Sequence, residues 1–147
     1  MKRNVRGFTL VEILIVVIIL GILAAIVIPQ FTNASNDARN NSIASTLQTL
    51  RSQIELYKIQ HSDTPPAVTS MWTHMLNASN TTGATNATAT TLFPLGPYVQ
   101  SAPINPANGN SAIGAAAATN VGWVYSVNGS SYTIQAVNTA GGAVLTY

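Results

Sequence analysis

A nearly continuous apolar run close to the amino terminus constrains this chain more than any other feature. From Phe8 to Ile28 the residues are almost all aliphatic or aromatic, and Thr9 and Glu12 are the strongly polar exceptions. A helix of that length, rising about 1.5 Å per residue, spans about 30 Å, the thickness of a bilayer's hydrocarbon core. A cleaved secretory signal has a shorter apolar region of about 7–15 residues and a small-residue cleavage site after it. No such site clearly follows here, so we predict a membrane anchor.

The charges around this run are one-sided. Lys2, Arg3 and Arg6 precede it and no acidic residue does. The positive-inside rule therefore keeps the amino terminus in the cytoplasm and places the carboxyl-terminal part across the membrane. The formal net charge of +2 depends on these three residues, and no basic stripe follows them, so nucleic-acid binding is not expected. The absence of cysteine excludes disulfides, thiol catalysis and cysteine-ligated metal centres.

Glu12 lies one turn into the apolar run. An ionised side chain at the bilayer centre costs roughly 2.5–3.5 kcal/mol on insertion scales, and less near the interface. One interpretation is a side chain that snorkels to the membrane edge. The other is a paired carboxylate. No other charged residue lies within the run, so a partner has to come from the amino terminus or from a neighbouring molecule.

The residues around Glu12 resemble the class III signal of type IV pilins and type II secretion pseudopilins. The similarity covers roughly residues 1–31. It combines a short basic leader, glycine before the cut, phenylalanine after it, glutamate at the fifth mature position and a helix-length apolar run. The matching residues are Gly7-Phe8-Thr9-Leu10-Val11-Glu12.

This resemblance implies processing and assembly. A prepilin peptidase would cut between Gly7 and Phe8, removing residues 1–7, and would methylate the new amine of Phe8. Glu12 would then pair with the Phe8 amine of an adjacent subunit. Pairing within one subunit is the alternative for the unassembled chain, because residues four apart share a helical face.

A second implication concerns the segment from Gly21 to Pro29. Glycine and proline both weaken a helix, and the resemblance implies a segment that can lose helicity on assembly, as in related filaments. We expect these residues to be helical or kinked in the free subunit and partly melted in the filament.

The resemblance implies an α+β, pilin-like fold, in which a long amino-terminal helix packs against a small antiparallel sheet. Residues 8–28 would form the membrane and filament-core helix, and residues 29–147 the globular head. We expect the helix to run to about residue 62, before Pro65-Pro66, although residues 32–42 have poor helix propensity. Apolar residues at helical spacing predict its buried stripe, namely Ile43, Leu47, Leu50, Ile54 and Tyr57. Arg51, Glu55 and Lys58 lie off the stripe and are expected on a solvated face.

The rest of the head reads as a short helix, a variable region and a sheet. The short helix would present Met71, Trp72, Met75 and Leu76 to the core. Residues 77–120 would be a variable loop, whose low-complexity part, 77–91, is expected to be mobile. Residues 121–147 predict a β-meander with a two-residue Asn128-Gly129 turn. Its expected cross-strand pairs are Val127 with Ser130, Tyr125 with Tyr132, Trp123 with Ile134, and Val121 with Ala136. Gly141-Gly142 would then lead into a third strand, Ala143–Tyr147.

No catalytic or metal-binding constellation is evident. Calcium is possible by resemblance to major pseudopilins, but no Asp or Glu follows Asp63 to supply carboxylate ligands. His61 and His74 are the only histidines, and we expect ordinary surface or core roles for them. The chain is therefore expected to be neither an enzyme nor a cofactor-binding protein.

Two further patterns favour a secretion pseudopilin over a pilus pilin. Gly96-Pro97-Tyr98 and Pro103-Ile104-Asn105-Pro106 are similar to the Gly-x-Tyr-Leu and Pro-x-x-Pro stretch of major pseudopilins. Many pilus pilins have a disulfide-bounded loop, which a chain without cysteine lacks.

The function predicted first is a structural subunit of a type II secretion pseudopilus, anchored by one pass in the bacterial inner membrane with its head in the periplasm. Its partners would be further copies of itself, the prepilin peptidase, the inner-membrane assembly platform and minor pseudopilins. A type IV pilus pilin for adhesion, motility or DNA uptake is the alternative. A membrane-tethered binding or enzymatic domain is a third, weakened by the lack of a convergent polar site.

Overall fold

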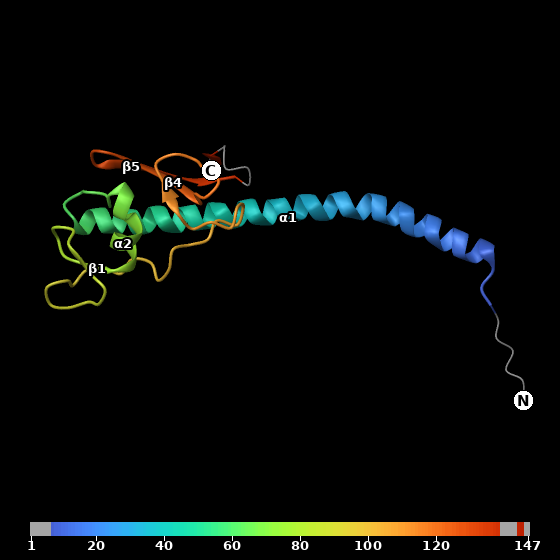
Figure 1. The fold of residues 1–147 in the computed structure, drawn as a ribbon, viewed down its shortest axis with the longest axis horizontal. Helices are drawn as coiled ribbons and strands as arrows, with labels where there is room; N and C mark the ends of the chain where they lie inside the picture. Colours follow the sequence, from blue (N-terminus) through green and yellow to red (C-terminus); the bar gives the residue numbers. More distant parts are fainter. Residues whose placement is uncertain (1–6, 139–143, 146–147) are drawn as a thin grey trace, which may run out of the picture. The chain divides into compact units, whose positions relative to one another are not determined.

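The structure, a computed structural model, describes residues 7–138 and 144–145 and has the expected α+β, pilin-like architecture (Figure 1). The chain divides into two compact units, one up to Ala38 and the other from Arg39 onward. The elements, in chain order, are α1 (Leu10–Gln60), the 3-10 helix η1 (Val68–Ser70), α2 (Met71–Leu76), β1 (Ala78–Ser79), β2 (Thr85–Asn86), β3 (Ile113–Gly114), β4 (Trp123–Asn128), β5 (Ser131–Val137) and β6 (Val144–Leu145).

The core of the second unit lies between the carboxyl-terminal half of α1 and the sheet. Figure 1 shows β4 and β5 along one side of this part of the helix. Burial of apolar side chains between two amphipathic elements is the main force that holds such a unit together. The predicted stripe is confirmed, because its five residues are the buried residues of α1. They cluster with Met71, Met75, Trp123, Tyr125, Ile134 and Ala136.

The end of α1 lies close to the predicted residue 62, but its cause differs from the expectation. The helix ends at Gln60, before Pro65-Pro66 is reached. Ser62 and Asp63 have positive φ angles of 55° and 61°, and the Asp63 N–H donates to the Lys58 carbonyl at 2.9 Å. Residues in the left-handed region satisfy the last carbonyls of a helix and turn the chain away. This cap, rather than the prolines, terminates α1.

The β4–β5 hairpin forms as predicted, but its register is shifted by two residues. Tyr125 pairs with Ile134 and Val127 with Tyr132, so the two-residue turn is Gly129-Ser130 instead of Asn128-Gly129. Gly129 has a φ of 59°, which suits the first turn position of a type II′ hairpin. A shift of two residues keeps every side chain on its face, because side chains alternate with a period of two.

Three features of the head go beyond the sequence-based expectations. β3 pairs in parallel with β4 at the edge of the four-stranded sheet. The segment expected to be a loop contains the β1–β2 hairpin, in which Ala78 and Ser79 are buried. The predicted pairing of Val121 with Ala136 is wrong, because Ala136 pairs with Trp123, whereas Val121 precedes β4 and belongs to a second, smaller cluster with Val124 and Val137.

The predicted third strand is present as β6, which pairs with β5. The reversal at Gly141-Gly142 and the remaining residues of that strand lie outside the described residues.

Candidate assembly site

The predicted cleavage site precedes the first helical residue. Gly7 and Phe8 are exposed and non-helical, and α1 begins at Leu10. A β-carbon added at Gly7 would meet nothing within 4 Å, so the fold itself does not require glycine there. A requirement for glycine at this position would therefore come from an enzyme that reads it.

Thr9 and Glu12 form a reciprocal cap at the start of α1. The Glu12 N–H donates to Thr9 Oγ1 at 3.2 Å, and the Thr9 N–H donates to Glu12 Oε2 at 3.4 Å. The Thr9 carbonyl also accepts the first helical bond, from Ile13 at 3.3 Å. This is a capping box, which satisfies two backbone donors that a helix start otherwise leaves free. Sequence reasoning missed it, although Thr-x-x-Glu before an apolar run is its known signal.

The capping box bears on the predicted charge pairing. Phe8 is still joined to Gly7 here, so its nitrogen carries no free charge, and Glu12 binds the N–H of the next residue. Cleavage would create an amine one residue from the group that the carboxylate already holds. Pairing of Glu12 with Phe8, within one chain or between chains, stays a prediction.

The apolar side chains of the first unit are solvent-exposed throughout. From Leu10 to Phe31 the large apolar residues are between 47% and 82% exposed. By length and composition, α1 can cross a membrane, with a mean hydropathy of 3.3 over its most apolar window and none of that window buried. Such a surface requires lipid or other protein around it.

Gly21 and Pro29 both lie within α1, which continues through them. Pro29 has no N–H to donate to the Ala25 carbonyl, which weakens the helix at this point. Thr32 Oγ1 also bonds back to the Ile28 carbonyl at 3.1 Å, a contact that slightly destabilises and bends helices. Two defects thus lie within one turn. Melting of this segment in a filament stays a prediction.

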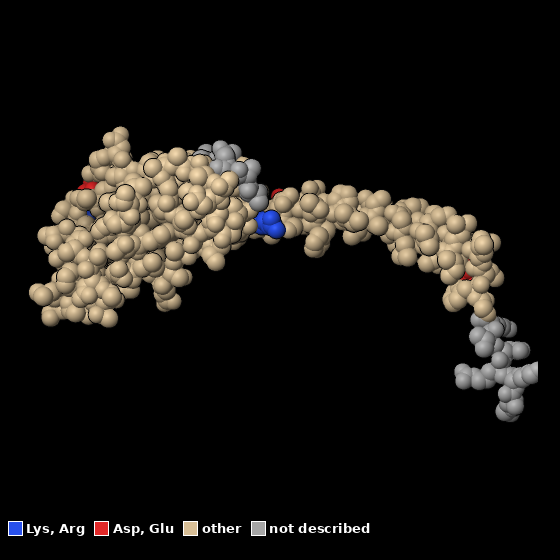
Figure 2. Space-filling view, viewed as in Figure 1, with Lys and Arg blue, Asp and Glu red and all other residues tan. Residues whose placement is uncertain are grey.

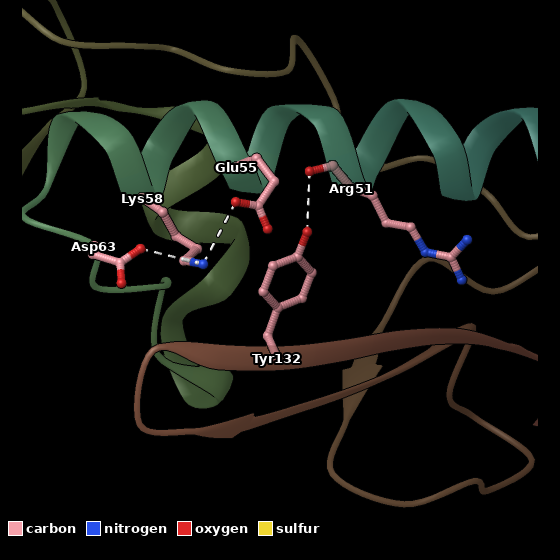
Figure 3. Close-up of polar contacts among 5 residues, drawn as sticks. All are labelled: Arg51, Glu55, Lys58, Asp63 and Tyr132. Carbon is pink, nitrogen blue, oxygen red and sulfur yellow. Dashed lines mark hydrogen bonds and ion pairs between the residues drawn. The ribbon is translucent and has the colours of Figure 1, made fainter.

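Two of the charged residues expected on a solvated face are less exposed than predicted, whereas Glu55 is exposed as predicted. Figure 3 shows these residues with Asp63 and Tyr132. Arg51 and Lys58 are half-buried. Lys58 Nζ lies 3.5 Å from Glu55 and 3.4 Å from Asp63. The Tyr132 hydroxyl donates to the Arg51 carbonyl at 3.1 Å, which ties β5 to α1. Burial, reinforced by the Glu55 carboxylate, raises the pKa of Tyr132 to about 12.

His61 has a structural role. It is 4% exposed, stacks on the Tyr57 ring at 3.7 Å, and places Nδ1 2.7 Å from the Tyr57 carbonyl oxygen. A histidine that bonds a carbonyl in the last turn stabilises the helix end. His74 meets the edge of the same Tyr57 ring at 5.7 Å. In the part of the chain that the structure describes, no three His, Asp or Glu side chains gather as metal ligands would.

Asparagine side chains close the loop that precedes β4. Asn105 is fully buried and donates to the Gly122 and Val137 carbonyls at 2.7 and 2.8 Å. Its Oδ1 accepts the Ala107 N–H at 2.9 Å, so the amide is satisfied at both ends. Asn108 donates similarly to the Val121 carbonyl at 2.8 Å. These carbonyl oxygens accept hydrogen bonds from side-chain amides, and no carboxylate, the ligand that calcium binds most strongly, lies near them in sequence.

Comparison with known proteins is consistent with this arrangement. Residues 2–28 match the prokaryotic N-terminal methylation motif. Type II secretion system core protein G of Dickeya chrysanthemi is 40% identical over 65 residues, or 44% of this chain and 42% of that protein. The protein of the same name in Klebsiella pneumoniae is 31% identical over 106 residues, or 72% of this chain and 71% of that protein.

The similarity to other proteins is uneven in extent. A type IV narrow pilus major component of Thermus thermophilus is 35% identical over 60 residues, 41% of this chain. The chain spans less than half the length of several core protein G relatives, among them the Dickeya protein. No solved structure matches the chain. The Klebsiella pneumoniae match nevertheless covers most of both proteins, and the chain therefore belongs to the type II secretion system core protein G family.

Proposed function

We propose that this chain is the structural subunit of a type II secretion pseudopilus and helps to drive protein export. Residues 1–7 are removed between Gly7 and Phe8, the Phe8 amine is methylated, and the apolar helices of many copies form the filament core. The observation that carries this proposal is the exposed apolar surface of α1 from Leu10 to Phe31. That surface is covered by lipid before assembly and by other copies afterwards.

The role of Glu12 follows from the low dielectric of both surroundings. A carboxylate withdrawn from water is tolerated when an opposite charge and hydrogen bonds accompany it. The Thr9 N–H provides one hydrogen bond within the chain. The Phe8 amine of the adjacent subunit supplies the positive charge. Each copy that enters the filament therefore neutralises a charged group of its neighbour.

The function is structural, with neither catalysis nor a cofactor. We infer that the head is stabilised without calcium, which is supported by the amide bonds of Asn105 and Asn108 to backbone carbonyls. The subunit is held in the inner membrane by one helix, with its head in the periplasm. The prepilin peptidase, the assembly platform and minor pseudopilins are its partners, as the basic leader and the methylation motif support.

A type IV pilus pilin is the second candidate. It is favoured by the similarity to the Thermus thermophilus pilus component, which covers 52% of that protein. The apolar helix serves filament assembly in both cases, so the exposed surface of α1 supports both functions equally.

The test uses the full chain in its host. Mass spectrometry of the mature protein is expected to show a methylated Phe8 at the amino terminus, and electron microscopy to show filaments when the chain is overproduced. Replacing Gly7 with a bulky residue is expected to leave the precursor uncut. Glu12→Ala is expected to permit cutting and to impair filaments, and normal filaments from this variant would contradict the charge pairing. Loss of the gene should retain exported proteins in the periplasm, whereas loss of surface pili alone would favour the second candidate.

A further inference from the structure

Three charged residues of the head lie along one groove. No Asp, Glu, Lys or Arg follows Asp63, so the larger part of the head carries no charge. Arg51, Glu55 and Lys58 line a groove of about 430 Å³ whose opposite wall is residues 130–135, from the hairpin turn into β5. Figure 2 shows that few charged atoms reach the visible face.

Within this groove, one cation lacks an acidic partner. Lys58 contacts both Glu55 and Asp63, so these two carboxylates are satisfied by their own chain. The Arg51 side chain extends away from Glu55 in Figure 3, and its guanidinium donates to the Ile134 carbonyl at 3.3 Å. A guanidinium carries five N–H donors. Among residues 7–138 and 144–145, the structure contains no ion pair of Arg51.

Outside the apolar run, one carboxylate likewise forms no ion pair among the described residues. The chain has four acidic residues, of which Glu55 and Asp63 bind Lys58 and Glu12 caps its own helix. The fourth, Asp37, is exposed on α1 and forms no ion pair among the described residues. Arg39 is two positions away, a spacing at which helical side chains do not face each other.

We propose that Asp37 of one copy binds the Arg51 groove of a neighbouring copy. The inference rests on the proposed filament, since only assembly brings many copies together in a fixed register. Charge complementarity identifies the occupant, because Asp37 is the one acidic side chain outside the apolar run that forms no ion pair among the described residues. A planar guanidinium binds a carboxylate through two parallel hydrogen bonds, which fixes orientation as well as distance.

The contact sets register rather than overall affinity. Pairs at a solvated surface contribute little net free energy, whereas like charges placed together disfavour a wrong arrangement strongly. The apolar helices thus supply the attraction, and the Asp37–Arg51 contact selects how far one subunit is displaced along its neighbour.

Charge reversal in the full chain tests the inference. Asp37→Arg and Arg51→Asp are each expected to lower the filament yield roughly tenfold, because each places like charges together. The double variant, in which the charges are exchanged, is expected to restore the yield. Arg39→Asp is the matched control and should leave it unchanged. Thermal melting of each variant in detergent establishes that the head is folded.

Cross-linking supplies a second measurement. Because the sequence contains no cysteine, the introduced cysteines are the only thiols that can react. Two differently tagged copies, one with Asp37→Cys and one with Arg51→Cys, are expressed together and treated with a short bis-maleimide. We expect a heterodimer that carries both tags, in assembled filaments only, and none when Arg39→Cys replaces Asp37→Cys. Filaments that form without this cross-link, or a double reversal that fails to restore the yield of a folded protein, would overturn the contact while leaving the proposed function intact. A wild-type chain that forms no filaments would overturn both.

Discussion

Thr9 and Glu12 each accept a backbone hydrogen bond from the other at the first turn of α1, at 3.2 and 3.4 Å. The polar residues that interrupt the apolar run are thus partners in one local structure. An amino-terminal helix end placed in or near lipid has few other groups to satisfy its free N–H donors. The same carboxylate can therefore stabilise the helix start in the membrane and remain available for an incoming amine.

Replacing Thr9 with alanine should loosen the first turn of α1. The Glu12 N–H loses its side-chain acceptor, and loss of such a cap costs about 1 kcal/mol. Hydrogen exchange of the mature chain in detergent micelles is expected to be several-fold faster at Glu12 and unchanged beyond Gly21. Thr9→Ser keeps the hydroxyl and is the control. Equal hydrogen-exchange rates at Glu12 in the wild type, Thr9→Ala and Thr9→Ser would show that the cap does not form in a micelle.

Replacing Asn105 with alanine should destabilise the head strongly. The buried amide donates two bonds and accepts one, and each buried polar group left unpaired costs about 1–3 kcal/mol. We expect a decrease of about 2–4 kcal/mol in the free energy of unfolding, measured by urea titration of the full chain in detergent.

Asn110→Ala provides the matched control for Asn105. The Asn110 amide donates one bond, to the Thr119 carbonyl at 3.0 Å, at an exposed position. Its replacement is expected to cost less than about 1 kcal/mol, because water can take over an exposed bond. Similar decreases in the free energy of unfolding of the two variants would contradict the role of Asn105 in closing the loop before β4.

Helical periodicity was sufficient to predict the core stripe of α1, because a period near 3.6 over four turns has no strand counterpart. The residues that terminate the helix were harder to predict. Ser62 and Asp63 adopt left-handed backbone angles that neither residue type requires. The prediction therefore assigned the helix end to the known helix-breaking residues, Pro65-Pro66.

The hairpin register shows a similar limit. Asn128-Gly129 and Gly129-Ser130 are both acceptable two-residue turns, and the alternatives preserve the faces of every strand residue. Burial patterns therefore cannot distinguish them. β3 was also not predictable, since a two-residue edge strand has no periodicity of its own.

The head should lose stability in alkaline solution. Burial, reinforced by Tyr98, raises the pKa of Tyr57 from 10.0 to about 12, and that of Tyr132 is raised likewise. A raised pKa in the folded state means that the unfolded chain releases its protons first. Stability is therefore fully present below pH 10 and declines between about pH 10 and 12.

Urea titrations at a series of pH values measure this decline. Tyr57→Phe removes one of the buried phenols. The free energy of unfolding should then decrease less steeply with pH above pH 10 and change little at pH 7. A slope that is identical in the variant would show that Tyr57 is not protected from ionisation in the folded head.

Calcium should not change the stability of the head. The loop before β4 is closed by Asn105 and Asn108, and neutral amides with backbone oxygens bind calcium weakly. We expect the Tm of the full chain in detergent to be the same in excess EDTA and in millimolar calcium. Ligand binding to the folded state raises Tm with concentration, so a calcium-dependent rise, absent with magnesium, would refute a calcium-free head.

Replacing Pro29 with alanine should stiffen α1 and hinder assembly. Alanine restores the N–H donor to the Ala25 carbonyl and removes a residue that costs about 3 kcal/mol inside a helix. The helical content of the mature variant in detergent should rise slightly, and its filament yield should fall, because melting of the segment from Gly21 to Pro29 becomes less favourable. Thr32→Val, which removes the hydroxyl bond to Ile28, should act in the same direction but more weakly. Both arguments depend on a loss of helix during assembly, so a filament map of the wild-type protein with continuous helix through Pro29 would contradict them.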